Sequence, residues 1–255
     1  MLKIDHLGKR FGGLYALKDV SVRAAPAEIT AVIGPNGAGK STLMNVISGL
    51  IAPDHGSVEV AGVAITGLKP HEVCRQGVAR TFQNLQMFTD MTVLETVVTG
   101  RTRHMTASLM ANLLMTPHAR HDERAAVEVA RTLLQTMGIA PDYWSRRSGD
   151  LPYGLQRRVE IARALATEPV FMLLDEPAAG LNDDESAALG ETLSKLAEGG
   201  IGIVLIEHDI ELVMNVSRHI FVMDAGTVIA EGTPEAVRRN PGVVAAYLGD
   251  EHVEA

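Results

Sequence analysis

The 255-residue sequence is poor in cysteine, in basic residues and in long apolar runs. Its single cysteine, Cys74, cannot form a disulfide within the chain, which fits a reducing compartment. No apolar run approaches the roughly 18 residues that a membrane-spanning helix needs; the longest candidates are residues 170–174 and 201–206. Residues 1–6 alternate apolar and polar side chains and lack the apolar stretch of a signal peptide. We therefore expect a cytosolic protein that reaches a membrane only through a partner.

Positive charge is also scarce, because 23 lysines and arginines face 31 aspartates and glutamates, for a formal net charge of -8. This balance argues against a nucleic-acid-binding surface, although a local basic patch is compatible with it. No internal repeat, low-complexity tract or Gly/Ser-rich linker divides the sequence. With 46% hydrophobic and 21% charged residues, the chain is expected to fold as one large α/β domain or two small ones.

The hydropathy pattern changes twice along the chain. The first third predicts strands, at 2–7, 20–24, 29–33 and 57–61. In the middle, Thr92 and Glu95 form a capping box that predicts a helix start, and residues 122–137 have helical periodicity. From residue 170 onward, apolar strands at 170–174, 201–206 and 220–223 alternate with helices at 183–198 and 209–217, and Thr233 opens a last helix. Short apolar strands between amphipathic helices predict a parallel sheet covered on both faces.

Residues 34–41, Gly-Pro-Asn-Gly-Ala-Gly-Lys-Ser, match the phosphate-loop pattern G-x-x-x-x-G-K-[ST]. A predicted strand enters the loop and a predicted helix, 41–48, leaves it. Glycines let backbone N–H groups turn toward phosphate oxygens, and the helix N-terminus adds partial positive charge. Lys40 would reach the β- and γ-phosphates, and the Ser41 hydroxyl would bind Mg²⁺. The loop predicts a nucleoside triphosphate site, which leaves kinases, GTPases and many ATPases open.

Residues 170–176, Val-Phe-Met-Leu-Leu-Asp-Glu, predict a buried strand that ends in two carboxylates. Asp175 would hold Mg²⁺ through water, and Glu176 would orient the water that attacks the γ-phosphate. Taken without the phosphate loop, the same pattern is also compatible with a strand followed by two surface carboxylates. The two motifs together favour a nucleotide hydrolase.

Two further polar residues follow predicted strands. Glu207 and His208 directly follow the apolar run 203–206. Because ligands of parallel sheets bind at the carboxyl ends of the strands, His208 should face the γ-phosphate and the water. By itself such a histidine is more often structural. Gln83 follows a short predicted strand, 78–81, and could add its carbonyl oxygen to Mg²⁺ and the water.

In this order, the motifs resemble those of the nucleotide-binding subunit of ATP-binding cassette (ABC) transporters, and the resemblance covers essentially the whole chain. The matching elements are residues 34–42, Gln83, the signature region 151–156, Asp175 with Glu176, residues 179–182, and His208. The resemblance implies an α/β fold, namely a P-loop NTPase ABC cassette in one domain, 1–255. In that fold a RecA-like parallel-sheet core, about 1–84 and 159–255, carries an N-terminal antiparallel β part, and an α-helical subdomain is inserted at about 85–158.

The resemblance also implies an ATPase that binds ATP and Mg²⁺. Its catalytic residues would be Glu176, His208 and Gln83, and its Mg²⁺ ligands Ser41, Gln83 and Asp175. Phe11 resembles the aromatic residue that stacks on adenine, with Tyr15 as a weaker candidate, and Gly154 would contact ATP bound by a partner subunit. The loop residues implied in nucleotide binding are Gly34, Pro35, Asn36, Gly37, Ala38, Gly39, Lys40, Ser41 and Thr42.

The signature region departs from the family pattern. The usual Leu-Ser-Gly-Gly-Gln is replaced by Leu-Pro-Tyr-Gly-Leu at 151–155. Pro152 has neither a hydroxyl nor an N–H, so it cannot make the contact that the family serine makes to the γ-phosphate. In the family two cassettes enclose two ATP molecules, each between one phosphate loop and the other signature. We therefore expect a heterodimer whose competent site is the one on this chain; alternatively, backbone N–H groups and the helix dipole suffice at the site that faces Pro152.

A finer resemblance is to the ATP-binding subunits of branched-chain amino-acid importers. It is carried by Arg80-Thr-Phe-Gln-Asn84, the Tyr-Gly and Gln-Arg-Arg of the signature region, a tail with Ala246-Tyr-Leu-Gly249, and an insert at 101–121. Related importers carry urea, amides or other small polar compounds, and a soluble ABC ATPase without a transporter is a further alternative. The apolar part of the insert, 105–115, would pack on the helix at 122–137 or contact a membrane protein.

The importer resemblance implies several partners and a location. The partners would be a second ABC ATPase subunit, two transmembrane permeases and, indirectly, a periplasmic or surface substrate-binding protein, without nucleic acid. The chain would be peripheral at the cytoplasmic face of the inner membrane.

Overall fold

The computed structural model describes residues 1–81, 88–105 and 116–248, which divide into two compact units. The first unit combines residues 1–80 with those from 170 onward, and the second comprises residues 81–169. The second unit therefore ends later than the residue 158 expected for the helical subdomain. Helix α6 (Tyr153–Leu165) runs without a break through that position, so a boundary there would cut a helix in two.

A six-stranded sheet forms the centre of the first unit, in the order β10-β9-β3-β8-β7-β6. Five of its strands pair in parallel, namely β3 (Ile29–Ile33), β6 (Val78–Arg80), β7 (Phe171–Asp175), β8 (Gly202–Ile206) and β9 (His219–Asp224). Strands β3, β7 and β8 are buried along their whole length, as apolar strands of a sheet covered on both faces should be. The edge strand β10 (Thr227–Gly232) pairs antiparallel with β9 in a hairpin that the sequence pattern did not predict.

A second, antiparallel sheet of the first unit has the order β2-β1-β4-β5. Its strands are β1 (Leu2–Phe11), β2 (Leu14–Ala24), β4 (His55–Val60) and β5 (Val63–Ala64). Buried and accessible residues alternate along much of these strands, because one face of the sheet packs on the core.

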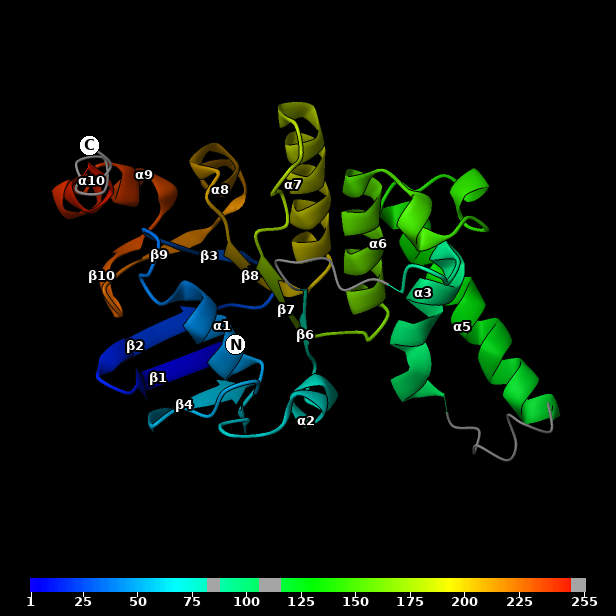
Figure 1. Ribbon diagram of the computed structural model, residues 1–255, viewed down its shortest axis with the longest axis horizontal. Coiled ribbons are helices and arrows are strands. Elements are labelled where there is room, and N and C mark those ends of the chain that lie inside the picture. Colours follow the sequence, from blue (N-terminus) through cyan, green and yellow to red (C-terminus); the bar gives the residue numbers. More distant parts are fainter. Residues whose placement is uncertain (82–87, 106–115, 249–255) are drawn as a thin grey trace. The chain divides into compact units, whose positions relative to one another are not determined.

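Among the described residues, apolar clusters lie on both faces of the six-stranded sheet. Figure 1 shows the helices and the antiparallel sheet that cover these faces. The first cluster joins the antiparallel sheet, helix α1 (Lys40–Ile47) and side chains such as Val32 of β3. The second places Ala31 and Ile33 of β3 against helices α8 (Ile210–Val216), α9 (Pro234–Arg238) and α10 (Pro241–Leu248). Helix α7 (Asp183–Glu198) packs on α8, and α2 (Pro70–Arg75) contacts β6. Neighbouring residues of β3 thus point into different clusters, which holds this strand at the centre of the unit.

The second unit is helical, with α6 and α5 (Pro117–Thr136) both packed on α3 (Val93–Thr99). Short 3-10 turns lie at Gly100–His104, Pro141–Tyr143 and Ser148–Asp150. The predicted capping box is confirmed, since the Glu95 N–H donates to Thr92 Oγ1 over 3.2 Å and the Thr92 N–H donates to Glu95 Oε2 over 2.9 Å. Helix α5 starts five residues before the predicted 122, because the Thr116 hydroxyl caps it and proline occupies its first position.

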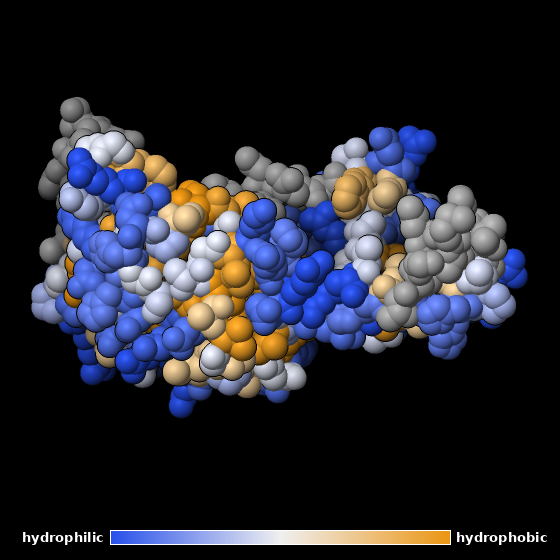
Figure 2. All heavy atoms as spheres, turned by 90° about the horizontal axis from the view of Figure 1, so that it is seen from below, coloured by the Kyte–Doolittle hydropathy of each residue, from blue (hydrophilic) through white to orange (hydrophobic). Residues whose placement is uncertain are grey.

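Within the described part of the chain, no helix is long and apolar enough to cross a membrane. On the face shown in Figure 2, hydrophobic side chains form limited areas with hydrophilic ones around them.

Candidate active site

The phosphate loop directly follows the buried strand β3 and leads into helix α1. Gly34, Gly37 and Gly39 have φ values of 148°, 81° and 103°, which side-chain-bearing residues rarely adopt. A Cβ at Gly34 would lie 2.0 Å from the Met223 carbonyl oxygen, and one at Gly39 would lie 2.4 Å from that of Ala16. At Gly37 a Cβ would meet no atom within 4 Å. Gly34 and Gly39 therefore let the loop pack closely against its neighbours, while Gly37 faces open space.

Lys40 and Ser41, the first residues of α1, lie at the inner end of this loop. The buried Lys40 side chain curls back, and its Nζ donates to the carbonyl oxygens of Gly34 and Pro35 over 2.5 and 2.9 Å. Ser41 is exposed, and Gly39, at the N-cap of α1, offers no side-chain cap to the helix. An ammonium group, a hydroxyl and the N-terminal end of a helix thus converge on one loop, which is the donor set that binds phosphate.

The two predicted carboxylates lie at the end of β7. Asp175 is buried, whereas Glu176 is half-buried and has a left-handed backbone with φ of 49°. The Glu176 N–H donates to the Ile206 carbonyl oxygen over 2.8 Å, which ties the turn to β8. A non-glycine residue in this conformation is strained by about 1 kcal/mol or more and is held only by its surroundings, which is typical of functional sites. The turn aims Asp175 and Glu176 in different directions although they are adjacent.

His208 and Glu176 meet at the same edge of the sheet, with Nε2 and Oε1 2.9 Å apart. Strands β3, β8 and β7 are adjacent and parallel, so the phosphate loop, His208 and Glu176 all follow carboxyl ends of neighbouring strands. His208 thus lies at the sheet edge that the sequence predicted, and its orientation toward the γ-phosphate stays a prediction. A histidine within hydrogen-bonding distance of a glutamate can orient that carboxylate toward a water molecule.

Glu207 is a buried acid that the sequence reasoning assigned no role. It accepts the Ala178 N–H over 2.6 Å and the His208 N–H over 3.1 Å. Burial raises the pKa of the Glu207 carboxyl, the backbone hydrogen bonds oppose this shift, and the nearby Glu176 charge adds to it. Glu207 thus ties the turn after Glu176 to the one that carries His208.

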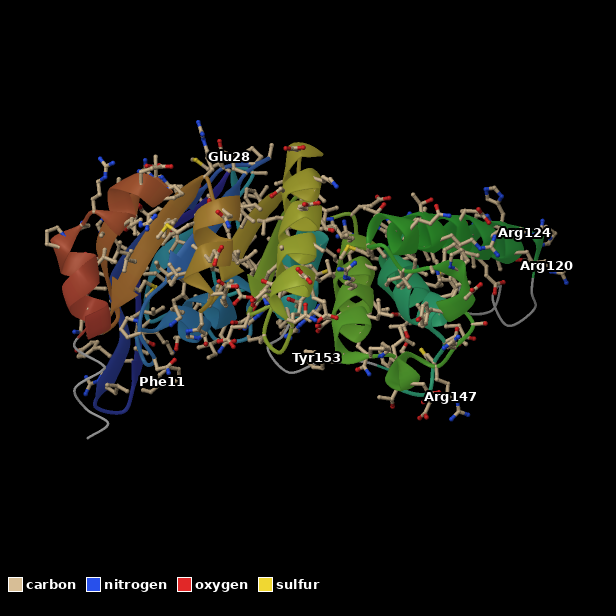
Figure 3. The ribbon with its side chains drawn as sticks, turned by 90° about the horizontal axis from the view of Figure 1, so that it is seen from above. Phe11, Glu28, Arg120, Arg124, Arg147 and Tyr153 are labelled. Atoms are coloured by element: carbon tan, nitrogen blue, oxygen red, sulfur yellow. The ribbon has the colours of Figure 1, made fainter. Side chains whose placement is uncertain are left out.

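Phe11 ends β1 at the tip of the β1–β2 hairpin and is 47% exposed (Figure 3). Tyr15, in β2, is 50% exposed. Lys9 and Arg10 lie over the Phe11 and Tyr15 rings, 5.6 and 5.3 Å from their centroids. Both aromatic rings are therefore about half exposed, with a cationic side chain over each.

The signature residues lie in the helical unit, at the start of α6. Pro152 is the N-cap, and α6 receives no side-chain cap there. Tyr153 is the first helical residue, at the N-terminal end of α6 in Figure 3, and Gly154 follows in the first turn. The predicted residue Gln83 and residues 106–115 of the insert lie outside the described residues.

The residues present fit a nucleotide with a divalent cation. Lys40 and the loop supply positive charge for phosphates, and the Ser41 hydroxyl and the Asp175 carboxylate are oxygen donors, which Mg²⁺ prefers. Asp175 sits at the end of a strand beside other site residues rather than on an isolated surface.

A family model described as "ABC transporter" matches residues 17–179. The chain belongs to the ABC transporter family. It is an ATP-hydrolysing, nucleotide-binding subunit of a transporter. A second model, "Branched-chain amino acid ATP-binding cassette transporter", matches residues 227–253 of this ABC ATPase.

Curated relatives span the whole ABC ATPase. It is 42% identical to the high-affinity branched-chain amino acid transport ATP-binding protein BraF of Pseudomonas aeruginosa, over 98% of both chains. It is 41% identical to the protein LivG of Escherichia coli K12, which carries the same description, again over 98% of both.

Solved ABC cassettes have the same fold. A nucleotide-free cassette from an ABC transporter is 34% identical, with a TM-score of 0.84 over 97% of this chain and 98% of that one. A cassette in its ADP conformation gives the same identity and TM-score over 98% of both chains. A dimeric bacterial cassette is 26% identical, with a TM-score of 0.78 over 92% of this chain and 99% of that one.

Proposed function

We propose that this ABC ATPase energises the uptake of branched-chain or similar small amino acids. The observation that carries its catalytic role is the Glu176–His208 contact of 2.9 Å at the strand ends beside the phosphate loop. The substrate class is supported by the branched-chain family model at the C-terminus and by the names of the full-length relatives.

In the proposed reaction Lys40 and the loop N–H groups bind the phosphates and stabilise the charge that develops on them. Glu176 orients the attacking water and accepts its proton, and His208 holds the Glu176 carboxylate in place. Gln83 would add a carbonyl oxygen to the water and the metal. Mg²⁺, held by Ser41, Asp175 and Gln83, would neutralise charge on the β- and γ-phosphates. Phe11 would stack on the adenine, and Gly154 would contact ATP bound by the partner subunit.

Replacing Glu176 by Gln tests the catalytic role. Glutamine keeps an oxygen that His208 can donate to but cannot take a proton, so ATP affinity should be retained while turnover falls about 100-fold or more. Turnover of the assembled transporter and ATP binding to the variant measure the two effects. Glu191→Gln, an exposed change on α7, is the control and should leave both unchanged. Residual activity of Glu176→Gln within about tenfold of the wild type would contradict the assignment.

Uptake tests the substrate class. In cells that lack the gene, the wild-type chain should restore accumulation of labelled leucine, isoleucine or valine. Excess unlabelled branched-chain amino acids should compete, whereas urea and simple amides should not. Competition by urea or amides alone would assign the transporter to those compounds. If the chain changes the uptake of none of the tested compounds, a soluble ATPase outside transport is favoured.

The proposed assembly places this chain with a second, different ABC ATPase subunit and two permeases at the cytoplasmic face of the membrane, with a substrate-binding protein on the other side. The heterodimer is supported by the replacement of the signature serine by Pro152, while Lys40, Asp175, Glu176 and His208 are all present in this chain. The site formed by this chain's phosphate loop and the partner's signature would then be the competent one.

A further inference from the structure

Arg80 is a buried cation at the end of β6 to which the proposed mechanism gives no role. It pairs with Leu173 of β7 across the sheet, and its side chain is only 8% exposed. One guanidinium nitrogen, Nη2, donates to Asp175 Oδ2 over 3.0 Å. The other, Nη1, donates to Asn45 Oδ1 over 2.7 Å and to Ser48 Oγ over 2.9 Å.

These contacts join the Asp175 carboxylate to the helix that begins at the phosphate loop. Asn45 lies in α1 and Ser48 is its C-cap, while Lys40 and Ser41 form the first turn of the same helix. The guanidinium is planar and its donors have a fixed geometry, so acceptors at both ends hold it in one orientation. Arg80 holds the Asp175 carboxylate through Oδ2. Oδ1 is the other oxygen of that carboxylate.

The pair is also electrostatically required. The Asp175 side chain is 5% exposed, and breaking a buried ion pair by removing one partner is costly. Burial lowers the pKa of the Arg80 guanidinium, whereas the Asp175 charge raises it. Arginine stays protonated at physiological pH, so Arg80 supplies a permanent positive charge.

We propose that Arg80 is a positioning residue for Mg²⁺ binding, which holds the Asp175 carboxylate fixed relative to helix α1. The proposal rests on the proposed role of Asp175 as a metal ligand. Groups that hold a metal-ligating carboxylate affect metal affinity although they do not touch the metal. Loss of Arg80 should therefore weaken the Mg²⁺-dependent part of ATP binding and spare the part that needs no metal.

The test measures ATP binding to the full chain, with EDTA and across a Mg²⁺ titration. In Arg80→Met the Mg²⁺ concentration for half-maximal enhancement of ATP binding should rise about tenfold or more. Affinity in EDTA should change by less than about threefold, because the phosphate loop is untouched. Arg80→Lys keeps the charge but not the two-ended geometry, so it should shift the Mg²⁺ midpoint in the same direction by a smaller factor. If Arg80→Met fails to fold, as thermal unfolding will show, Arg80→Lys still answers the question.

Two further variants separate the possible failures. Arg101→Met breaks the ion pair between Arg101 and Glu168 in the helical unit, and should leave the Mg²⁺ midpoint unchanged. Asp175→Asn should raise the midpoint if Asp175 is the metal ligand. No shift in Asp175→Asn would overturn the proposed metal site itself. A shift in Asp175→Asn with wild-type midpoints in folded Arg80→Lys and Arg80→Met would overturn the role of Arg80 alone.

Discussion

Two adjacent carboxylates, Asp175 and Glu176, make different contacts because the backbone turns sharply between them. Asp175 ends the buried strand and pairs with Arg80, while the left-handed Glu176 turns out to meet His208. Glu207 accepts backbone N–H groups from both turns and holds them together. Buried charged groups, Arg80 and Glu207, thus hold the two carboxylates and the turns around them.

Glu207 leads to a pH prediction. Its folded-state pKa lies above the unfolded value of about 4.5, so its contribution to stability is fully present below that pH and is lost as pH rises through the folded pKa. Glu207→Gln cannot ionise and escapes this loss. The stability of the variant relative to wild type should therefore rise as pH increases from about 4 toward neutrality.

Urea unfolding of both proteins across that pH range measures the effect. Glu207→Gln also removes one acceptor, the one for the His208 N–H. This cost does not depend on pH, so it equals the difference in unfolding free energy between the two proteins at the lowest pH. If the free energy of unfolding of the variant relative to wild type stays constant or falls as pH rises, burial does not raise the pKa of Glu207.

Helix α6 begins at the unusual signature, whose effect on ATP turnover can be tested by substitution. Pro152 is its N-cap and offers neither a hydroxyl nor an N–H to a ligand. In the assembled heterodimer Pro152→Ser should raise ATP turnover, because it restores the hydroxyl at the site on the partner subunit. Pro152→Ala restores the N–H alone and is the matched control. Equal turnover of wild type, Ser and Ala variants would mean that the backbone and the helix dipole suffice.

Most elements could be predicted from local patterns, and the exceptions have physical reasons. Helix α7 has the predicted bounds, 183–198, and β7 and β8 lie within one residue of theirs, because short apolar strands and capped amphipathic helices are local signals. The half-exposed β10 and the six-residue α2 were missed, since neither has a strong periodicity. At the site, phosphate-loop glycines and strand-end carboxylates could be found from spacing. The Arg80–Asp175 contact, between residues 95 positions apart, could not.

At the scale of the whole molecule, this ABC ATPase combines a nucleotide site in one unit with a signature helix in the other. Each ATP site of the proposed dimer needs the phosphate loop of one subunit and the signature of the second. If the proposed dimer is correct, the ATPase activity of this chain should depend on its partner subunit.

This chain should work as the ATPase of a membrane transporter, bound to its permeases. The most direct test of this role is affinity purification of the tagged chain from detergent-solubilised native membranes, with quantitative mass spectrometry of what copurifies. We expect two polytopic permeases and a second, different ABC ATPase to copurify in stoichiometric amounts. Recovery of the chain alone, or with soluble proteins only, would contradict this role.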